Sequence, residues 1–278
     1  MRVELPISSI RNRRRCFPEA PLITRCKSAS HSKNVAPSSN GSGSQKVQNG
    51  ILLSLAAGEF DALFPKLVFV DLPKHALLNE IAEPIEWAYF INRGLASFLN
   101  VMTDGKSVEV GLTGKEGFVG LPLLAGFSTS PSRAVMQVDG SAFRISPVDF
   151  QEALQAYPSL DRNLQRFSQI LGMQAMQAAA CNRLHEVDQR LARWLLMSQD
   201  RLAGDVVPLT QETLANMLGT RRASVTEAAG ILQKAGLITY RRGDVKIDDR
   251  GGLEGAACEC YNAMRRLAEK WRSEASSG

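Results

Sequence analysis

The chain has 278 residues, of which 44% are hydrophobic and 22% charged, values that are ordinary for a globular protein of one or two domains. Nine of its 33 Lys and Arg lie in residues 1–50, together with two of its 28 Asp and Glu, so residues 51–278 hold 24 basic and 26 acidic side chains. The net charge of +5 therefore comes from residues 1–50, and the globular part is not basic overall. Any nucleic-acid interface there must be a local patch.

The cysteines and the hydropathy pattern exclude two further classes of protein. The five cysteines are odd in number and have no Cys-x-x-Cys spacing, which argues against a closed disulfide framework; they are Cys16, Cys26, Cys181, Cys258 and Cys260. We therefore expect a reducing, cytoplasmic setting. The sequence has no run of 18 or more apolar residues, so no transmembrane helix is expected.

Residues 1–48 are rich in Ser, Asn, Gly and Arg and have no hydrophobic periodicity, which predicts a disordered basic leader. Three interpretations stay open. The segment resembles an organellar transit peptide in composition. The run "RNRRR" (11–15) is also suited to contact phosphates, and an upstream start codon would equally add residues without a structural role.

Residues 49–158 show short apolar runs separated by turn signals. "WAYFINRGLASFLNVM" (87–102) is broken by "NRG", which predicts a hairpin, and further turn signals stand at Asp104-Gly105, Gly114-Lys115 and Asp139-Gly140. Strands at this spacing predict a small antiparallel sandwich or roll.

Residues 159–183 change to a helical period. A narrow seam steps by three and four along this segment, through Leu160, Leu164, Phe167, Leu171, Gln174, Ala178 and Cys181. Because the seam is narrower than the stripe of most core helices, we interpret Leu160 to Ala178 as a two-helix dimer interface, with an ordinary core helix as the alternative. A second amphipathic helix is predicted over 185–202.

The stretch "LTQETLANMLGTRRASVTEAAGILQKAGLI" (209–238) predicts two helices that cross over a short turn. Thr210 is a suitable N-cap, and Gly219 can adopt the left-handed conformation that the corner requires. The inward residues of the first helix are Leu214, Ala215 and Leu218. Thr220 is expected to cap the second helix, whose inward residues are Val225, Ala228, Ile231 and Leu232, and Gly236 ends it.

The second helix begins with Arg221 and Arg222, although the positive end of the helix dipole disfavours cations there. Strongly negative DNA would explain them. "LITYRRGDVKID" (237–248) adds a two-stranded wing with a turn at Gly243-Asp244. The predicted DNA-contacting residues are Thr210, Gln211, Thr220, Arg221, Arg222, Ser224, Val225, Thr226, Arg241 and Arg242. Arg222 is expected to read a base, with phosphate contact and an ordinary surface position as alternatives, and Glu227 is either a base contact or a solvated charge.

This order of parts resembles the Crp/Fnr superfamily of bacterial transcription regulators over residues 50–262; the resemblance is carried by residues 209–238, by "RLARWLL" (190–196) and by a roll followed by a long helix. It implies an α+β fold: an N-terminal antiparallel, jelly-roll-like β-roll of the cyclic-nucleotide-binding type (49–158), a dimerisation helix (159–183) and a C-terminal winged helix-turn-helix (184–262), followed by a helix end and tail (263–278). It further implies a homodimer that reads a palindromic operator in double-stranded DNA and contacts RNA polymerase.

The expected effector site departs from the cyclic-nucleotide-responsive members. It comprises Gly120, Leu121, Leu123, Arg133 and Ala134; Leu121 stands where those members have a ribose-binding Glu, and no charged residue occurs between Gly117 and Ser132. Without charge-assisted partners cAMP is not expected to bind, and an apolar or neutral effector or a closed pocket is expected instead. Cys16 and Cys26 lack the number and spacing of an iron–sulfur site, His75 alone does not indicate haem, and no metal site is predicted.

The sequence leaves two other classes of function to compare with this one. An enzyme is not expected, because the chain lacks a Walker loop, a Gly-x-Ser-x-Gly motif and His/Cys metal spacing. A sensory module that signals through protein contact is the alternative function. Exposure of Arg221, Arg222, Arg241 and Arg242 on one face would favour DNA, whereas burial or pairing with Asp or Glu would favour protein contact.

Overall fold

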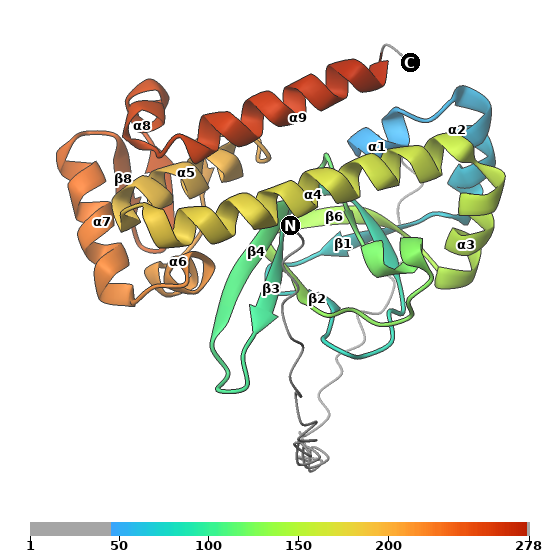
Figure 1. Ribbon diagram of the computed structural model, residues 1–278, viewed down its shortest axis with the longest axis horizontal. Coiled ribbons are helices and arrows are strands. Elements are labelled where there is room, and N and C mark those ends of the chain that lie inside the picture. The colour runs from blue at the N-terminus through green and yellow to red at the C-terminus, as the bar shows by residue number, and fades with distance from the viewer. Residues whose placement is uncertain (1–45, 277–278) are drawn as a thin grey trace, which may run out of the picture. The chain divides into compact units, whose positions relative to one another are not determined.

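The computed structural model describes residues 46–276, so almost all of the predicted leader lies outside the described residues. The first part of the described chain is an antiparallel roll, as expected (Figure 1). Its main path runs β1-β6-β3-β4, while β2 pairs with β6 and β5 pairs with β3. The strands are β1 (Val68–Leu72), β2 (Leu77–Asn79), β3 (Ala88–Val101), β4 (Ser107–Thr113), β5 (Phe118–Val119) and β6 (Arg133–Ile145).

Short helices close the ends of the roll: α1 (Gly50–Leu53), α2 (Ala57–Leu63), η1 (Phe64–Lys66), η2 (Leu121–Ala125) and α3 (Pro147–Ala156). The core beneath them is aromatic. The ring centroids of Phe90 and Phe118 are 4.8 Å apart, and Phe118 stacks on Phe150 at 5.2 Å. All three side chains are fully buried, so this cluster joins the sheet to α3.

The hairpin predicted at residues 92–94 is wrong, because β3 continues through this segment with irregular register. Gly94 has φ +89°, and a Cβ on Gly140 of β6 would lie 2.0 Å from the carbonyl oxygen of Arg93. The two glycines therefore allow β3 and β6 to approach at a bulge. The predicted turn at Asp104-Gly105 is correct, since the Met102 amide donates to the Lys106 carbonyl at 2.7 Å.

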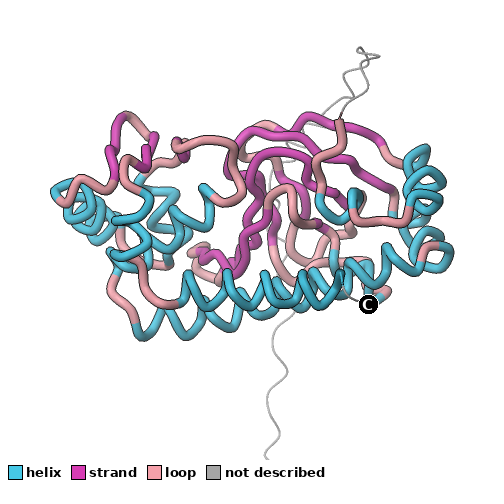
Figure 2. Tube along the Cα trace, turned by 90° about the horizontal axis from the view of Figure 1, so that it is seen from above, coloured by secondary structure: helices cyan, strands magenta, loops and turns pink. Residues whose placement is uncertain are grey.

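The long helix α4 (Pro158–Leu184) lies along the roll and continues to the C-terminal helices (Figures 1 and 2). The predicted dimer seam is its inward face. Leu160 and Leu164 are fully buried, Phe167 is 5% exposed and Gln174 is 8% exposed, while Leu171 and Ala178 are half-buried. The chain's own core covers Leu160, Leu164, Phe167 and Gln174, so the alternative of an ordinary core helix fits these four residues. Leu171 and Ala178 keep exposed surface, and for them the dimer interpretation stays a prediction.

The C-terminal part has the predicted winged helix-turn-helix order. It comprises α5 (Val187–Gln199), β7 (Val206–Val207), α6 (Gln211–Leu218), α7 (Arg222–Lys234), β8 (Ile238–Arg241), β9 (Asp244–Ile247) and α8 (Arg250–Ala256). Helix α5 is shorter than predicted because Glu186 and Gln189 form a capping box at its start. The three strands form one antiparallel sheet in the order β7-β9-β8.

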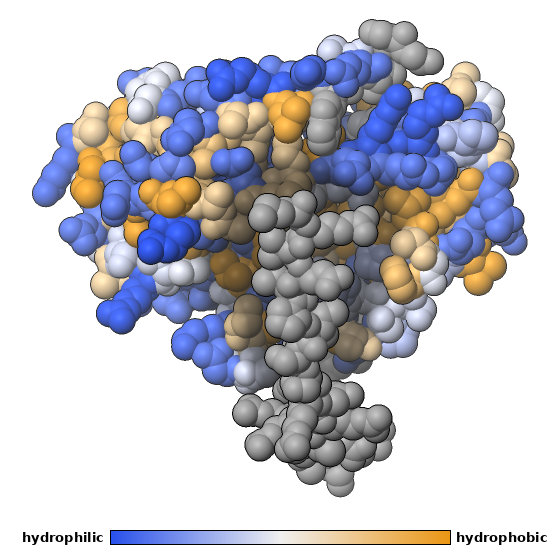
Figure 3. Space-filling view, in the orientation of Figure 1, coloured by the Kyte–Doolittle hydropathy of each residue, from blue (hydrophilic) through white to orange (hydrophobic). Residues whose placement is uncertain are grey.

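The last helix, α9 (Cys260–Ser276), is more than the helix end and tail expected after residue 262. It lies beside α4 in both views and contacts α4 and α5 (Figures 1 and 2). Tyr261 and Met264 are buried against these helices. Its outer side chains belong to the hydrophilic upper edge of the face in Figure 3. Within residues 46–276, none of the helices is long and apolar enough to cross a membrane.

Candidate nucleic-acid interface

The corner between α6 and α7 forms as the sequence predicts. The Thr210 hydroxyl accepts a hydrogen bond from the Thr213 amide at 3.2 Å, which caps α6. Gly219 ends α6 with φ +59°, and the Thr220 amide donates to the Ala215 carbonyl at 3.0 Å. Both hydrogen bonds arise from local residues, so α7 leaves the corner in a fixed direction.

Three details of α7 differ from the prediction. Arg221, not Thr220, is the N-cap, and its side chain forms no capping hydrogen bond. Ile231 is 48% exposed and therefore does not belong to the inward face. Val225 is fully buried, so it supports the helix from inside and cannot contact DNA.

The outward face of the first turns of α7 carries the expected polar residues. Arg221, Arg222 and Thr226 are exposed, and Ser224 is half-buried. The Thr226 hydroxyl lies 2.8 Å from Oε1 of Gln211 and 3.0 Å from the carbonyl oxygen of Arg222. These hydrogen bonds tie the start of α6 to α7 beside the arginines.

The wing presents two more arginines. Its turn is centred on Arg242 and Gly243, which have φ +50° and +93°, one residue earlier than the predicted Gly243-Asp244. Arg241 pairs with Asp244 in the backbone register, and both arginine side chains are exposed. A two-residue turn with positive φ at both positions suits the right-handed twist of a hairpin and holds Arg242 at its tip.

A cleft brings the two elements together. Arg222 of α7 and Arg242 of the wing line it, with Tyr240 between the strands and the helices; the other lining residues are Thr210, Gln211, Glu212 and Gly243. Tyr240 donates to the carbonyl oxygen of Leu209 at 3.2 Å. Burial raises the pKa of Tyr240, and the positive charge of Arg222 partly opposes this rise.

The four arginines are exposed, as contact with DNA requires, and the cleft places Arg222 and Arg242 on one face. Within residues 46–276, none of the side chains of Arg221, Arg222, Arg241 and Arg242 forms an ion pair with a carboxylate, and all four are exposed. Glu212, Glu227 and Asp244 are exposed nearby but leave these guanidinium groups free to contact a separate anion.

The residues of the expected effector site have contacts within the chain itself. The Arg133 side chain donates to Glu80 at 2.9–3.1 Å, and although burial raises the pKa of Glu80, the Arg133 hydrogen bonds hold that pKa below its ordinary value. Leu123 and Ala134 are buried in the core, and Leu121 is half-buried. Gly120 has φ +118° and begins η2. Arg133 is thus already neutralised by a carboxylate.

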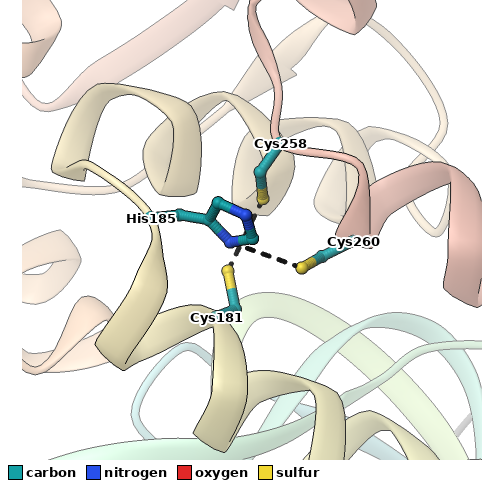
Figure 4. Close-up of side chains that lie close together, drawn as sticks. All are labelled: Cys181, His185, Cys258 and Cys260. Carbon is teal, nitrogen blue, oxygen red and sulfur yellow. Dashed lines mark hydrogen bonds between the residues drawn. The ribbon is translucent and has the colours of Figure 1, made fainter.

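Sequence analysis missed one cluster of chemically reactive side chains, at the end of α4. Cys181, His185, Cys258 and Cys260 come from two distant segments, and their ligand atoms all lie within 4.8 Å of one another (Figure 4). Two signals were present in the sequence. Cys181 and His185 are four residues apart, which places them on one helix face, and Cys258 and Cys260 form a Cys-x-Cys pair. The other histidine considered, His75, is exposed at a turn in the roll.

Comparison with known proteins agrees with this geometry. The family model of the Crp-like helix-turn-helix domain matches residues 189–256. Among solved structures, FixK2 from Bradyrhizobium japonicum aligns with TM-score 0.60 at 17% identity, over 69% of this chain and 98% of that one. A search of curated proteins finds no match.

Two further solved structures have the same fold. The c-di-GMP responsive global regulator CLP of Xanthomonas campestris aligns with TM-score 0.58 at 18% identity, over 69% of this chain and 99% of that one. TTHB099, a transcriptional regulator of the CRP family from Thermus thermophilus, aligns with TM-score 0.57 at 22% identity, over 68% of this chain and 96% of that one. The chain has the Crp/Fnr fold and carries a Crp-like helix-turn-helix domain. The fold class expected from the sequence is confirmed, and the expected resemblance is confirmed over the Crp-like helix-turn-helix domain at residues 189–256.

Proposed function

We propose that the chain is a sequence-specific DNA-binding transcription regulator of the Crp/Fnr type, acting in the cytoplasm and not as an enzyme. The observation that carries this proposal is the set of four exposed arginines, without carboxylate partners among the described residues, on α7 and the wing of a Crp-like helix-turn-helix domain. Double-stranded DNA carries closely spaced negative phosphates, which exposed arginines of this kind can bind.

The arrangement supports separate roles for the two arginine pairs. The first turn of α7 would enter the major groove, where the guanidinium group of Arg222 can bond to O6 and N7 of a guanine. Arg241 and Arg242 on the wing would contact phosphates beside the groove. Gln211 and Thr226 are hydrogen-bonded to each other. They would hold α6 and α7 at a fixed spacing against the sugar-phosphate backbone of the DNA.

We also propose a homodimer, formed by the outward face of α4 instead of the buried seam. Met176 is 71% exposed on this face, and Ala179 and Ala180 are exposed one turn further along. A Cβ added at Gly172 would meet no atom within 4 Å, so this position also points away from the chain. Small residues around one large apolar side chain would let a second α4 approach closely, and two-fold symmetry would present two copies of α7 to a palindromic operator.

The same proposal includes RNA polymerase as a partner and an effector other than cAMP. The pairing of Arg133 with Glu80 supports the second point, because a cyclic phosphate would have to displace a carboxylate that is already hydrogen-bonded. A neutral or apolar effector would not face this competition. The exclusion of cAMP is checked by calorimetric titration of the full-length protein, and heat of specific binding would contradict it.

The test of DNA recognition is selection of bound duplexes from a random pool, using the full-length protein. We expect enrichment of a sequence with two inverted halves whose centres lie about 10 base pairs, or a multiple of that, apart. A variant with Arg221, Arg222, Arg241 and Arg242 all changed to Ala is the matched control and should enrich nothing. Two results together would contradict the proposal. The wild-type protein would enrich no sequence, and it would bind polymeric DNA no more tightly than the four-alanine control does.

A further inference from the structure

The cluster at the end of α4 is built from four side chains that are common metal ligands. Cys181 lies in the last turn of α4 and His185 caps this helix, whereas Cys258 and Cys260 lie at the junction of α8 and α9. In Figure 4 the three sulfur atoms lie next to the imidazole ring, away from the His185 backbone. The three cysteines are at most 3% exposed, so the cluster is closed on the sulfur side.

The spacing of the ligand atoms fits one metal ion. Sγ of Cys181 and Sγ of Cys258 are 3.5 Å apart, and Sγ of Cys260 lies 3.5 Å from Nδ1 of His185. Zinc–sulfur bonds of about 2.3 Å in a tetrahedron place two thiolates about 3.8 Å apart. An iron–sulfur cluster inserts several iron and sulfide atoms between its cysteines and requires wider spacing. The observed spacing therefore favours a mononuclear site.

A second observation concerns the orientation of His185. Its Nε2 lies 3.1 Å from the Glu259 carboxylate, while its Nδ1 faces the sulfur atoms. A hydrogen bond from Nε2–H to the carboxylate leaves the lone pair of Nδ1 directed at the cysteines. Metal-ligating histidines usually donate their other ring N–H to a carboxylate in this way. Glu259 stands between Cys258 and Cys260, so one short segment supplies two ligands and the orienting group.

A third observation concerns charge. Arg190 of α5 is 6% exposed; its Nη2 donates to the carbonyl oxygen of Leu218, and its Nε has no hydrogen-bond partner among the described residues. Burial lowers the pKa of Arg190, and the groups that oppose this change are Cys181 and Cys258. A buried guanidinium group is costly without an anion nearby. Three thiolates around one divalent cation carry a net charge of −1 and would provide that anion.

We propose that Cys181, His185, Cys258 and Cys260 bind one Zn²⁺ ion in tetrahedral coordination, with Glu259 orienting the His185 ring. Three sulfurs and one imidazole nitrogen form a complete set for a structural zinc site and leave no position for substrate. The ion would join the end of α4 to the segment that starts α9. His185 and Glu186 also separate α4 from α5, so zinc would fix the joint that leads into the DNA-binding part.

The first test measures metal on the full-length protein, independently of DNA binding. The protein is purified under reducing conditions and analysed by inductively coupled plasma mass spectrometry, and we expect one zinc per chain. Replacement by Co²⁺ should give thiolate-to-cobalt charge-transfer bands and the strong visible bands of a tetrahedral site. Iron with acid-labile sulfide, a Cys181–Cys258 disulfide in the reduced preparation, or no bound metal after zinc is supplied would overturn the proposal.

The second test uses variants. Cys260→Ser should lose most of the bound zinc, and Glu259→Gln should lower zinc affinity about 10-fold or more because the acceptor of the Nε2–H hydrogen bond loses its negative charge. The matched control is Cys16→Ser with Cys26→Ser, which removes the two cysteines outside the described residues and should keep one zinc per chain. If Cys260→Ser does not fold, the cobalt spectrum of Glu259→Gln decides. Wild-type zinc affinity in both Glu259→Gln and Cys260→Ser, or loss of zinc in the control, would contradict the assignment.

Discussion

Arg221 and Arg222 stand at the positive end of the α7 dipole, where a cation is disfavoured by a few tenths of a kcal/mol or more. Both are exposed and neither is neutralised by a carboxylate of residues 46–276. Their unfavourable position in the free protein would become favourable in the proposed contact with phosphates and guanine acceptors. The two side chains are therefore suited to an anionic partner more than to the stability of the helix.

Replacement of Arg222 by Ala tests base reading. We expect a loss of about 1–3 kcal/mol on the selected operator and relaxed preference at one base position per half-site, because a bidentate contact is lost. Arg241→Ala is the comparison, and it should weaken binding to all sequences and reduce the salt dependence by about one counterion. Mobility-shift titrations on matched and mutated duplexes measure both. An equal loss for Arg222→Ala on every sequence would make this residue a phosphate contact.

Glu109 in β4 is a second residue whose environment has a measurable consequence. Its carboxylate accepts hydrogen bonds from Trp194 of α5 at 2.8 Å and from Ser97 at 2.5 Å. Burial raises its pKa to about 7, although these hydrogen bonds and the charges of Arg193 and Arg201 act in the opposite direction. The folded state thus holds a proton on Glu109 that the unfolded chain releases near its ordinary pKa.

The sign of the resulting pH dependence follows from linkage. Because the folded pKa is raised, stability is lost as pH rises from about 4.5 to about 7 and is constant above that range. Glu109→Gln removes this titration and should be more stable than the wild type at neutral pH by on the order of 2–3 kcal/mol, with little difference at the acidic end. Urea unfolding of both proteins across this range measures the difference. A difference that does not change with pH would contradict the raised pKa.

At the scale of the element, α4 shows what helical periodicity predicts and what it does not. The period of Leu160, Leu164 and Phe167 identifies a helix with a narrow apolar seam, and the structure contains both. Periodicity shows which residues share a face but not what covers it. Sheet and helices of the same chain cover this one, so a charged residue at Phe167 would damage folding and would not report on dimerisation.

Met176→Glu is the appropriate test of the proposed dimer. The side chain is 71% exposed in the single chain, so we expect the monomer to fold normally while two facing carboxylates separate the copies. Sedimentation velocity should show a monomer at concentrations where the wild type is a dimer. Val148→Glu on α3 is the matched control, since Val148 is 69% exposed, and should stay dimeric. A dimeric Met176→Glu protein would remove the outward face of α4 from the interface.

Elements differ in how well the sequence predicts them, according to the range of the interactions that form them. The corner at Gly219 depends on residues within a few positions, and its conformation was predicted. The turn expected at Gly94 was not formed, because its glycine serves an approach to Gly140 on another strand. The sulfur atoms of Cys181 and Cys258 lie 3.5 Å apart, although the two residues are 77 positions apart in the chain. Spacing rules for short motifs detect local pairs only, so this cluster required the fold.

At the scale of the whole molecule, the proposed zinc site lies where forces on the DNA-binding part would be transmitted. Helix α4 packs on the roll over most of its length and ends at Cys181 to His185, after which α5 begins the helix-turn-helix part. Helix α9 follows α8, the last element of that part, and contacts α4 again. Zinc would connect the two ends of the DNA-binding part at one point and restrict its rotation about the joint.

Removal of the metal should therefore change both stability and DNA affinity, the latter on the condition that the proposed DNA-binding function holds. We expect the zinc-free protein, prepared with a chelator under reducing conditions, to melt several degrees lower, because about 1 kcal/mol corresponds to 2–4 °C in a protein of this size. Its affinity for the selected operator should fall, since ordering the joint would have to occur on binding. The salt dependence should not change, because the arginine contacts are the same.

Zinc, but not Mg²⁺, should restore both properties, and the Cys16→Ser, Cys26→Ser protein should respond like the wild type. Calorimetry and mobility shift measure the two effects separately: an unchanged melting temperature would contradict a structural role for zinc, whereas an altered melting temperature with unchanged affinity would separate the metal from control of the DNA-binding part.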